Sequence, residues 1–446
     1  MRQYPEVDAA FALRQIEGWQ RAEHKLPELA AIEGWLWPKR LSLEQCSSQS
    51  TAVYKRQVLS KVEGGRSKVE GLRSKVEGQG EKGEEERESV LIDLTGGLGV
   101  DTYYLSEGFR EVHYVERNEE LCALAEKNFA LAGKRIMVHC CEAETFLEEW
   151  NGAHETHEAN EAHGANETTI FVDPARRDAH GGKVFRLEDC EPNVVAHLSI
   201  LRACARRVLM KLSPMLDVTE ALRALGGAAE VHVVAVRNEV KEVLVLLEAG
   251  RDSMDPEITC VNLETEEESF VFRKSEEDGP HETNEANGTN EAHGANEIIL
   301  VEPNAAIMKA GAFRTFGERY GLGKLGKNSQ LYVAKGVQRC IGESTERVLE
   351  SYVTFCGAEG SKNFEYAECK RLYPSLPGRI FTVHIATKEE LKNLNQANVI
   401  CRNYPLSPEA LKKKLRVRDG GEKYVIATKI GTKPVIFLGV RQFLHR

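Results

Sequence analysis

The sequence predicts an α/β protein built around a doubly wound, mainly parallel sheet of seven strands, with an N-terminal helical region and C-terminal α+β domains. Strand-like and helix-like segments alternate between Val90 and Gly250, a pattern typical of parallel strands joined by helical crossovers. Only residues 237–239 separate the last two strand-like segments. Three residues cannot carry a crossover, so the seventh strand is expected to run antiparallel to the sixth. A chain of 446 residues with 41% hydrophobic residues can bury several cores.

The first 59 residues are the predicted N-terminal helical region. Apolar residues recur there at roughly helical spacing, and Pro27 and Pro38 mark breaks between helices. The sequence Ser-Lys-Val-Glu-Gly then occurs three times between residues 60 and 78. Each unit contains a glycine and a single valine, so the repeat cannot build an apolar seam. We interpret residues 60–88 as a flexible linker.

The central α/β domain is predicted at residues 89–250. Its expected strands are Val90–Leu94, Val112–Glu116, Arg135–Cys140, Thr169–Asp173, Val208–Leu212, Glu230–Val236 and Val240–Leu247. The helices expected between them are Thr102–Glu107, Glu119–Ala132, Glu142–Trp150, Cys190–Arg206 and Leu216–Leu225. Six parallel strands and a seventh, antiparallel strand from a terminal hairpin form the Rossmann-like layout of class I methyltransferases that use S-adenosylmethionine (SAM).

Two low-complexity segments share the octapeptide Asn-Glu-Ala-His-Gly-Ala-Asn-Glu, at residues 160–167 and 290–297. Histidines in such tracts can bind metal, but no apolar residues fix their geometry here, so we predict solvated insertions and no metal site. One insertion interrupts the α/β domain at residues 151–167. The other belongs to a strand pair and linker that we predict at residues 251–297.

The α/β domain is organised around a strand that ends at Asp93 and passes into the turn Thr95-Gly96-Gly97-Leu98-Gly99-Val100-Asp101. Glycine lets backbone amides approach a ligand closely, so a nucleotide-like cofactor is expected at this turn. A dinucleotide fingerprint needs a third glycine where Thr102 stands, which makes NAD the weaker alternative. An acidic residue before a looser glycine pattern favours SAM. An ordinary buried strand and turn is the remaining interpretation.

Acidic residues follow the first three predicted strands, at the edge where a doubly wound sheet binds its ligand. Asp93 is predicted to orient the amino-acid part of SAM, directly or through water. Glu116 can accept hydrogen bonds from both ribose hydroxyls, and Glu142 can receive the adenine amino group. The predicted cofactor-binding residues are Asp93, Thr95, Gly96, Gly97, Gly99, Asp101, Glu116 and Glu142.

The fourth predicted strand ends in Asp173-Pro174-Ala175-Arg176-Arg177. Base-modifying methyltransferases carry Asp/Asn-Pro-Pro-aromatic at this position, where it holds an exocyclic amine in line with the methyl group. Asp173 and the rigid Pro174 are therefore the predicted catalytic residues. Ala175 and Arg176 replace the second proline and the aromatic ring, so the stacking ring of that motif is missing. The predicted substrate-binding residues are Arg176, Arg177, Lys183 and Lys211.

The composition indicates a cytoplasmic protein. Eleven cysteines without Cys-x-x-Cys spacing favour reduced thiols over disulfides or a zinc site. The N-terminus lacks the apolar core of a signal peptide, and no run of about 18 apolar residues follows, so no membrane association is expected. From Lys370 onward, 16 Lys and Arg face 5 Asp and Glu, although the whole chain carries a net charge of -10. This basic end favours a polyanionic partner, and a solvated basic face is the plainer alternative.

The motifs at residues 93–101 and 173–177 resemble those of a bacterial family of class I SAM-dependent methyltransferases that end in a THUMP-like domain. Further segments are similar to its N-terminal helical motif, its ferredoxin-like region and its C-terminal domain: residues 44–48 with 51–55, residues 302–307 with 325–329, and residues 403–407, 411–415 and 419–421. Residues 337–370 are an insertion by this comparison. The resemblance implies a ferredoxin-like region at residues 298–376 and a THUMP-like domain at residues 377–446.

The resemblance also implies an RNA substrate, because the catalytic core of the family is similar to RNA methylases and THUMP domains proper recognise tRNA. We therefore predict a SAM-dependent methyltransferase that acts on a nucleotide of tRNA or rRNA. Two alternatives stay open. One is a non-catalytic RNA-binding protein with a methyltransferase fold, which the altered motif at Ala175 and Arg176 motivates. The other is a methyltransferase of protein or of a small molecule.

Overall fold

The computed structural model describes residues 8–60, 88–156, 168–176, 186–278, 298–326, 328–334, 376–430 and 432–442. The chain divides into two compact units, Met1–Thr259 and Cys260–Arg446. Residues 61–87 of the predicted linker, residues 157–167 and 279–297 of the low-complexity segments, and the insertion at residues 337–370 lie outside the described residues. Within the described ranges, no helix is both long and apolar enough to cross a membrane.

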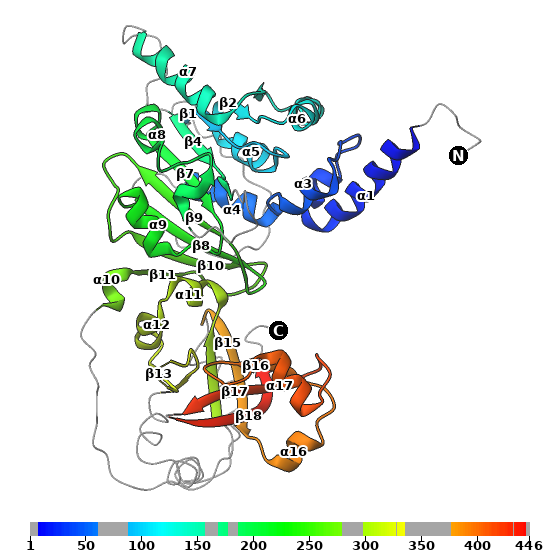
Figure 1. The fold of residues 1–446 in the computed structure, drawn as a ribbon, viewed down its shortest axis with the longest axis vertical. Coiled ribbons are helices and arrows are strands. Elements are labelled where there is room, and N and C mark those ends of the chain that lie inside the picture. Colours follow the sequence, from blue (N-terminus) through cyan, green and yellow to red (C-terminus); the bar gives the residue numbers. More distant parts are fainter. Residues whose placement is uncertain are drawn as a thin grey trace, which may run out of the picture. The chain divides into compact units, whose positions relative to one another are not determined.

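The sheet of the first unit has the predicted doubly wound layout (Figure 1). Within the first unit its strands are β1 (Glu88–Asp93), β2 (Phe109–Val115), β3 (Met137–His139), β4 (Thr168–Val172), β7 (Arg207–Leu212), β8 (Glu230–Val236) and β9 (Glu239–Glu248). They lie in the order β8-β9-β7-β4-β1-β2-β3. The pairs β1 with β2, β1 with β4, β2 with β3 and β4 with β7 are parallel. The carboxyl ends of these strands therefore meet along one edge.

The seventh predicted strand, β9, is antiparallel to its neighbours, as the short connection before it predicts. β9 pairs antiparallel with both β7 and β8, so it inserts between them. Arg237 and Asn238, which join β8 to β9, have φ values of 48° and 67°. Two consecutive residues of positive φ are typical of the tight hairpin turn that matches the twist of paired strands.

The helices of the α/β domain are α5 (Val100–Leu105), α6 (Glu119–Leu131), α7 (Ala143–Thr156), α8 (Leu198–Cys204) and α9 (Val218–Leu225). Two of the predicted helix bounds are wrong by more than two residues. α7 runs to Thr156, beyond the start of the predicted insertion at residue 151. The helix predicted from Cys190 begins only at Leu198, because Glu191 precedes Pro192 and a residue before proline disfavours the helical conformation. Instead β6 (Cys190–Glu191) pairs with β5 (Ala175–Arg176).

The N-terminal region contains the helices α1 (Ala9–Lys25), α2 (Pro27–Ala30), α3 (Arg40–Gln45) and α4 (Gln49–Leu59). Pro27 opens α2 at a position where a missing amide hydrogen is harmless. Trp35 and Trp37 are buried in one apolar cluster with Tyr103 of α5 and Phe129 of α6. The N-terminal helices are therefore packed onto the α/β domain as part of its core.

The chain leaves the first unit along β10 (Glu257–Leu263) and continues through β11 (Phe270–Arg273) and α10 (Lys274–Glu277). The following helices are α11 (Ala305–Ala310), α12 (Phe313–Arg319), α16 (Lys388–Lys392) and α17 (Pro408–Leu415). The strands of the second unit's seven-stranded sheet are β12 (Ile298–Pro303), β13 (Leu322–Lys324), β14 (Tyr332–Ala334), β15 (Gly378–Ile385), β16 (Asn398–Cys401), β17 (Lys423–Ile430) and β18 (Lys433–Gln442).

This second sheet joins the two C-terminal regions that the resemblance separates. Its order is β13-β14-β12-β15-β18-β17-β16. β12, in the predicted ferredoxin-like region, pairs antiparallel with β15, in the predicted THUMP-like domain. Leu300, Phe381, Ile426 and Phe437, from four of these strands, share one buried cluster. The predicted boundary between residues 376 and 377 therefore falls inside a continuous sheet.

Candidate active site

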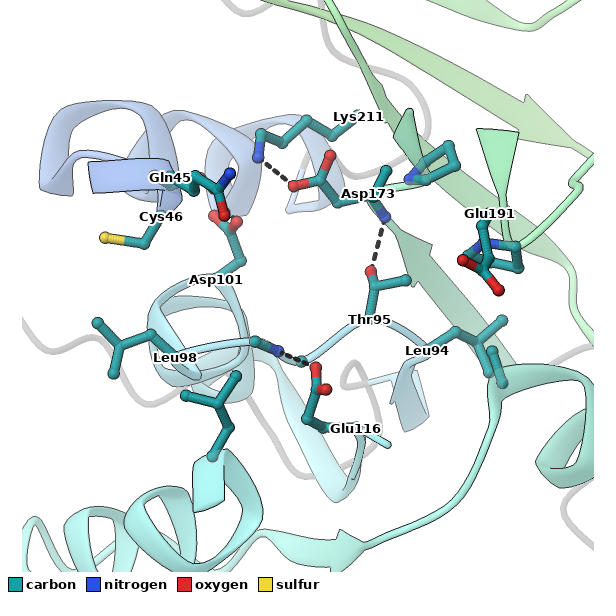
Figure 2. A pocket seen from close by; sticks show the side chains of 18 of the residues that line it. Gln45, Cys46, Leu94, Thr95, Leu98, Asp101, Glu116, Asp173, Glu191 and Lys211 are labelled. Atoms are coloured by element: carbon teal, nitrogen blue, oxygen red, sulfur yellow. Dashed lines mark hydrogen bonds and ion pairs between the residues drawn. The ribbon is translucent and has the colours of Figure 1, made fainter. Parts of the chain in front are cut away.

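A cavity of about 850 Å³ lies at the carboxyl ends of the strands of the first unit, and its volume is in the range typical of sites for small ligands. The loops after β1, β2, β3, β4 and β7 line it, together with residues of the segment that joins α3 to α4. Figure 2 shows Asp101, Asp173 and Glu116 around this cavity. Seven of the predicted cofactor-binding residues and both predicted catalytic residues lie at or beside its wall: Thr95, Gly96, Gly97, Gly99, Asp101, Glu116, Glu142, Asp173 and Pro174.

The glycines of the turn after β1 are required by packing on their outer side. A Cβ at Gly96 would lie 2.1 Å from the ring of Tyr114, and one at Gly99 would lie 2.6 Å from Phe129. Gly97 and Gly99 also have φ values of 55° and 78°, which favour glycine. The backbone amides of these three glycines are bonded within the protein: Gly96 donates to the Val115 carbonyl, Gly97 to the Glu116 carboxylate and Gly99 to the Gly96 carbonyl.

Asp93 lies beneath the turn and does not line the cavity. Its carboxylate accepts hydrogen bonds from the Thr95 amide at 3.0 Å and from the Thr102 hydroxyl at 2.5 Å. Burial raises the pKa of Asp93 to about 7. The sequence predicts that Asp93 orients the cofactor. In the structure its two hydrogen bonds stabilise the turn from below. Thr102, which breaks the dinucleotide pattern, is the partner that keeps this carboxylate in place.

Glu116 and Glu142 follow β2 and β3 and line the cavity. The Glu116 carboxylate accepts from the amide of Gly97 at 3.0 Å and from the amide of Asn118 at 2.9 Å, one bond on each oxygen. Each oxygen keeps a lone pair for a ligand donor. Glu142 is exposed and lies 3.6 Å from Arg117, which also pairs with Glu191 at 3.1 Å. Both carboxylates are thus held in place and able to accept further hydrogen bonds.

Asp101 belongs to a buried ion network that sequence reasoning missed. Its carboxylate accepts from the Ser47 hydroxyl at 2.7 Å and pairs with Lys55 at 3.2 Å. The fully buried Lys55 also donates to Glu242 at 2.9 Å. Burial opposes the ionisation of Asp101, but Lys55 and Lys211 hold its pKa below the usual value. Burial raises the pKa of Glu242, although the same two lysines oppose that shift.

Asp173 follows β4 and is held from two sides. Its backbone amide donates to the Thr95 hydroxyl at 2.7 Å, and its carboxylate accepts from the Lys211 ammonium. Burial alone would lower the pKa of Lys211, yet the carboxylates of Asp173, Asp101 and Glu242 raise it above its usual value. Lys211 is therefore a charged partner of Asp173. It also lines the cavity, so its contact with the substrate stays a prediction.

The remaining predicted substrate residues are only partly described. The backbone of Arg176 lies in β5, whereas Arg177 and Lys183 lie outside the described residues. The end of α3 and the segment after it were missed as part of the site, although they contribute four residues to the cavity wall: Ser42, Gln45, Cys46 and Ser47. Their only signal in the sequence is the motif at residues 44–55 that carries the family resemblance.

Comparisons with known proteins agree with this fold. Family models identify a ferredoxin-like domain at residues 300–339 and a domain like THUMP at residues 380–441. A crystal structure from Porphyromonas gingivalis, described as that of a candidate methyltransferase, is 29% identical with a TM-score of 0.67. That match covers 97% of this chain and 90% of the other.

Two curated relatives, from two strains of Mycobacterium tuberculosis, are described as uncharacterised S-adenosylmethionine-dependent methyltransferases. Each is 24% identical over 274 residues, which are 59% of this chain and 61% of the relative. The chain thus spans about three fifths of the length of these relatives. The predicted resemblance is confirmed: this chain is built as a class I methyltransferase fold followed by ferredoxin-like and THUMP-like domains.

Proposed function

We propose that this protein is a SAM-dependent methyltransferase that methylates a nucleotide of tRNA or rRNA in the cytoplasm. The observation that carries this proposal is the convergence of Asp101, Glu116 and Asp173 on one cavity at the carboxyl ends of the strands. A second support is the likeness over nearly the whole chain to the Porphyromonas gingivalis structure.

The charge of the cavity wall fits a positively charged cofactor. Six acidic side chains and three basic ones line it: Asp101, Glu116, Glu142, Glu144, Asp173 and Glu191 against Arg117, Lys211 and Lys241. This excess of carboxylates favours a cation and opposes entry of a phosphate. When bound, SAM supplies a methyl group on a positively charged sulfur. Glu116 would hold the ribose hydroxyls and Glu142 the adenine amine, as the sequence predicts.

The chemistry at Asp173 favours a nitrogen as the methyl acceptor. An ionised carboxylate only accepts hydrogen bonds, so Asp173 can orient an N–H group of the substrate and leave the nitrogen lone pair directed at the methyl group. The pair with Lys211 and the bond from the Asp173 amide to Thr95 fix this carboxylate in one place. Pro174 keeps the turn rigid. Positioning of this kind is the main requirement on a protein whose cofactor already carries the reactive group.

An RNA substrate is supported by the C-terminal domain. Its match is to a THUMP-like domain, and helix α17 has Lys412, Lys413 and Lys414 in its last turn. Lys413, Lys414 and Arg416 are exposed. Clustered basic side chains provide most of the affinity of a protein for a phosphate backbone. The acidic cavity would then receive a base or nucleoside while this domain contacts phosphates.

Calorimetric titration with SAM, combined with a methyl-transfer assay, tests the proposal. We expect Glu116→Ala to weaken SAM binding by about 10-fold to 100-fold, because charge-assisted hydrogen bonds are lost. Asp173→Ala should abolish transfer and leave SAM affinity within about threefold of the wild type. Glu126, exposed on α6 and outside the cavity, provides a control as Glu126→Ala. Equal SAM affinity in all four proteins would contradict the site. SAM binding without transfer to RNA or protein would favour a non-catalytic RNA-binding protein or a methyltransferase of a small molecule.

A further inference from the structure

The end of α3, with Gln45 as its last residue, and the segment after it form a wall of the cavity, although they precede the α/β domain in the chain. Ser47 bonds to Asp101 at 2.7 Å, and Lys55 donates to the Ser47 hydroxyl at 3.1 Å. On the other side of Gln45, Lys25 donates to the carbonyl groups of Leu43 and Glu44, each at 2.9 Å. The backbone that carries Gln45 is therefore fixed on both sides.

Gln45 differs from three carboxylates of the cavity wall in having no hydrogen-bond partner among the described residues. Asp101, Glu116 and Asp173 are each bonded within the protein. In the part of the chain that the structure describes, the Gln45 amide has no hydrogen bond, and its side chain is exposed. Figure 2 shows this amide on the side of the cavity where Asp101, Lys211 and Asp173 lie and away from Glu116. The amide is thus available to a ligand at the Asp173 side.

The chemistry of the amide complements that of its surroundings. The carboxylates of the wall can only accept hydrogen bonds, whereas the Gln45 amide both donates and accepts. A nucleobase edge also carries donors and acceptors side by side, and glutamine amides recognise such edges in pairs of hydrogen bonds. A base that offers an N–H group to Asp173 still needs a donor for its carbonyl or ring nitrogen.

We infer that Gln45 binds the edge of the methyl-accepting nucleobase and so helps to select which base reaches Asp173. This inference rests on the proposed function and assigns the substrate side of the cavity to the N-terminal region. In Figure 2 Gln45 lies on the Asp173 side of the cavity and away from Glu116, the predicted partner of the ribose. An unchanged SAM affinity is the result that separates a contact with the base from a contact with the cofactor near Asp101.

Two variants, Gln45→Ala and Gln45→Glu, test the inference. The assay measures the steady-state transfer of tritiated methyl from SAM to total RNA, which is taken from cells that lack this gene. We expect Gln45→Ala to raise the KM for RNA by about threefold to tenfold, the effect of one or two neutral hydrogen bonds. Gln45→Glu keeps the size of the side chain but loses the hydrogen-bond donor, so it should raise the KM for RNA by at least the same factor. Calorimetric affinity for SAM should not change. Gln57→Ala, an exposed glutamine of α4 outside the cavity, should behave as the wild type.

Two results would overturn the inference. Weaker SAM binding with an unchanged KM for RNA would make Gln45 a cofactor residue. An unchanged SAM affinity together with an unchanged KM for RNA would exclude any contact between Gln45 and a ligand. Failure of the proposed function is distinguishable from either result, because the wild-type protein itself would then transfer no methyl group to RNA.

Discussion

Replacing Lys55 by methionine tests whether the buried ion network holds the cavity together. Lys55 is 0% exposed and pairs with Asp101 at 3.2 Å and with Glu242 at 2.9 Å. Lys55→Met keeps most of the apolar stem and removes the ammonium, which leaves two buried carboxylates without their shared cation. Removing one partner of a buried ion pair typically lowers the free energy of unfolding by about 3–5 kcal/mol.

The penalty should depend on pH with a definite sign. Burial already raises the pKa of Glu242, and Lys55 opposes that shift, so the pKa rises further when Lys55 is lost. A carboxylate whose pKa is raised by folding stabilises the protein at low pH and loses that contribution as the pH rises. The difference between Lys55→Met and the wild type should therefore be larger at pH 8 than at pH 5.

Urea unfolding followed by tryptophan fluorescence measures this difference in the right part of the molecule. All four tryptophans, Trp19, Trp35, Trp37 and Trp150, lie in the first unit. The matched control is Lys39→Met, because Lys39 is 68% exposed and its pair with Glu120 at 2.6 Å lies at the surface. Loss of such a pair costs at most about 1 kcal/mol. Equal unfolding midpoints for the two variants, or a penalty that is the same at both pH values, would refute the role of the network.

Three further substitutions test the turn after β1. Burial raises the pKa of Asp93 to about 7, so its contribution to the free energy of unfolding should be present near pH 4 and fall away as the pH rises through 7. Asp93→Asn should remove this dependence in urea titrations at pH 5 and pH 7.5, and an unchanged pH dependence would exclude Asp93 as its source. Gly96→Ala places a Cβ 2.1 Å from the buried Tyr114 ring and should cost about 1–3 kcal/mol through overpacking, with weaker SAM binding. A Cβ at Gly97 would meet no atom closer than 3.8 Å, so Gly97→Ala should lower the free energy of unfolding only by the backbone strain of about 1–2 kcal/mol. Thermal melts and calorimetric SAM titration compare the two glycine variants. A larger loss of stability or of SAM affinity in Gly97→Ala than in Gly96→Ala would contradict this packing.

Alternating periodicity in the sequence was enough to predict the sheet of the first unit. The connection at Arg237 and Asn238 is too short for a crossover, and β9 is antiparallel to its neighbours as expected. The false helix start at Cys190 shows where periodicity misleads, because the local effect of Pro192 outweighs the apolar pattern. The continuous sheet through β12 and β15 depends on a pairing between segments far apart in the chain, which no local pattern contains.

The residues of the cavity that directly follow a strand could be placed from the sequence. The residues that reach the cavity through tertiary contacts could not. Glu116 and Asp173 were found because parallel strands bring their carboxyl ends to one edge. Asp93 was placed at that edge correctly, but its partners Thr95 and Thr102 turn it inward, beneath the turn. Lys55 was missed because its partner Glu242 lies 187 residues away along the chain. A buried lysine on a helix has no distinguishing mark in a single sequence.

Transfer of tritiated methyl from SAM to total RNA, run in parallel with transfer to protein, tests the proposed activity most directly. Both acceptors come from cells that lack this gene, so that the modified sites are still open. We predict label in one RNA species, lost with Asp173→Ala and retained with Gln57→Ala. Label in protein alone, or no label in either acceptor from a protein that binds SAM, would contradict methylation of RNA at this cavity.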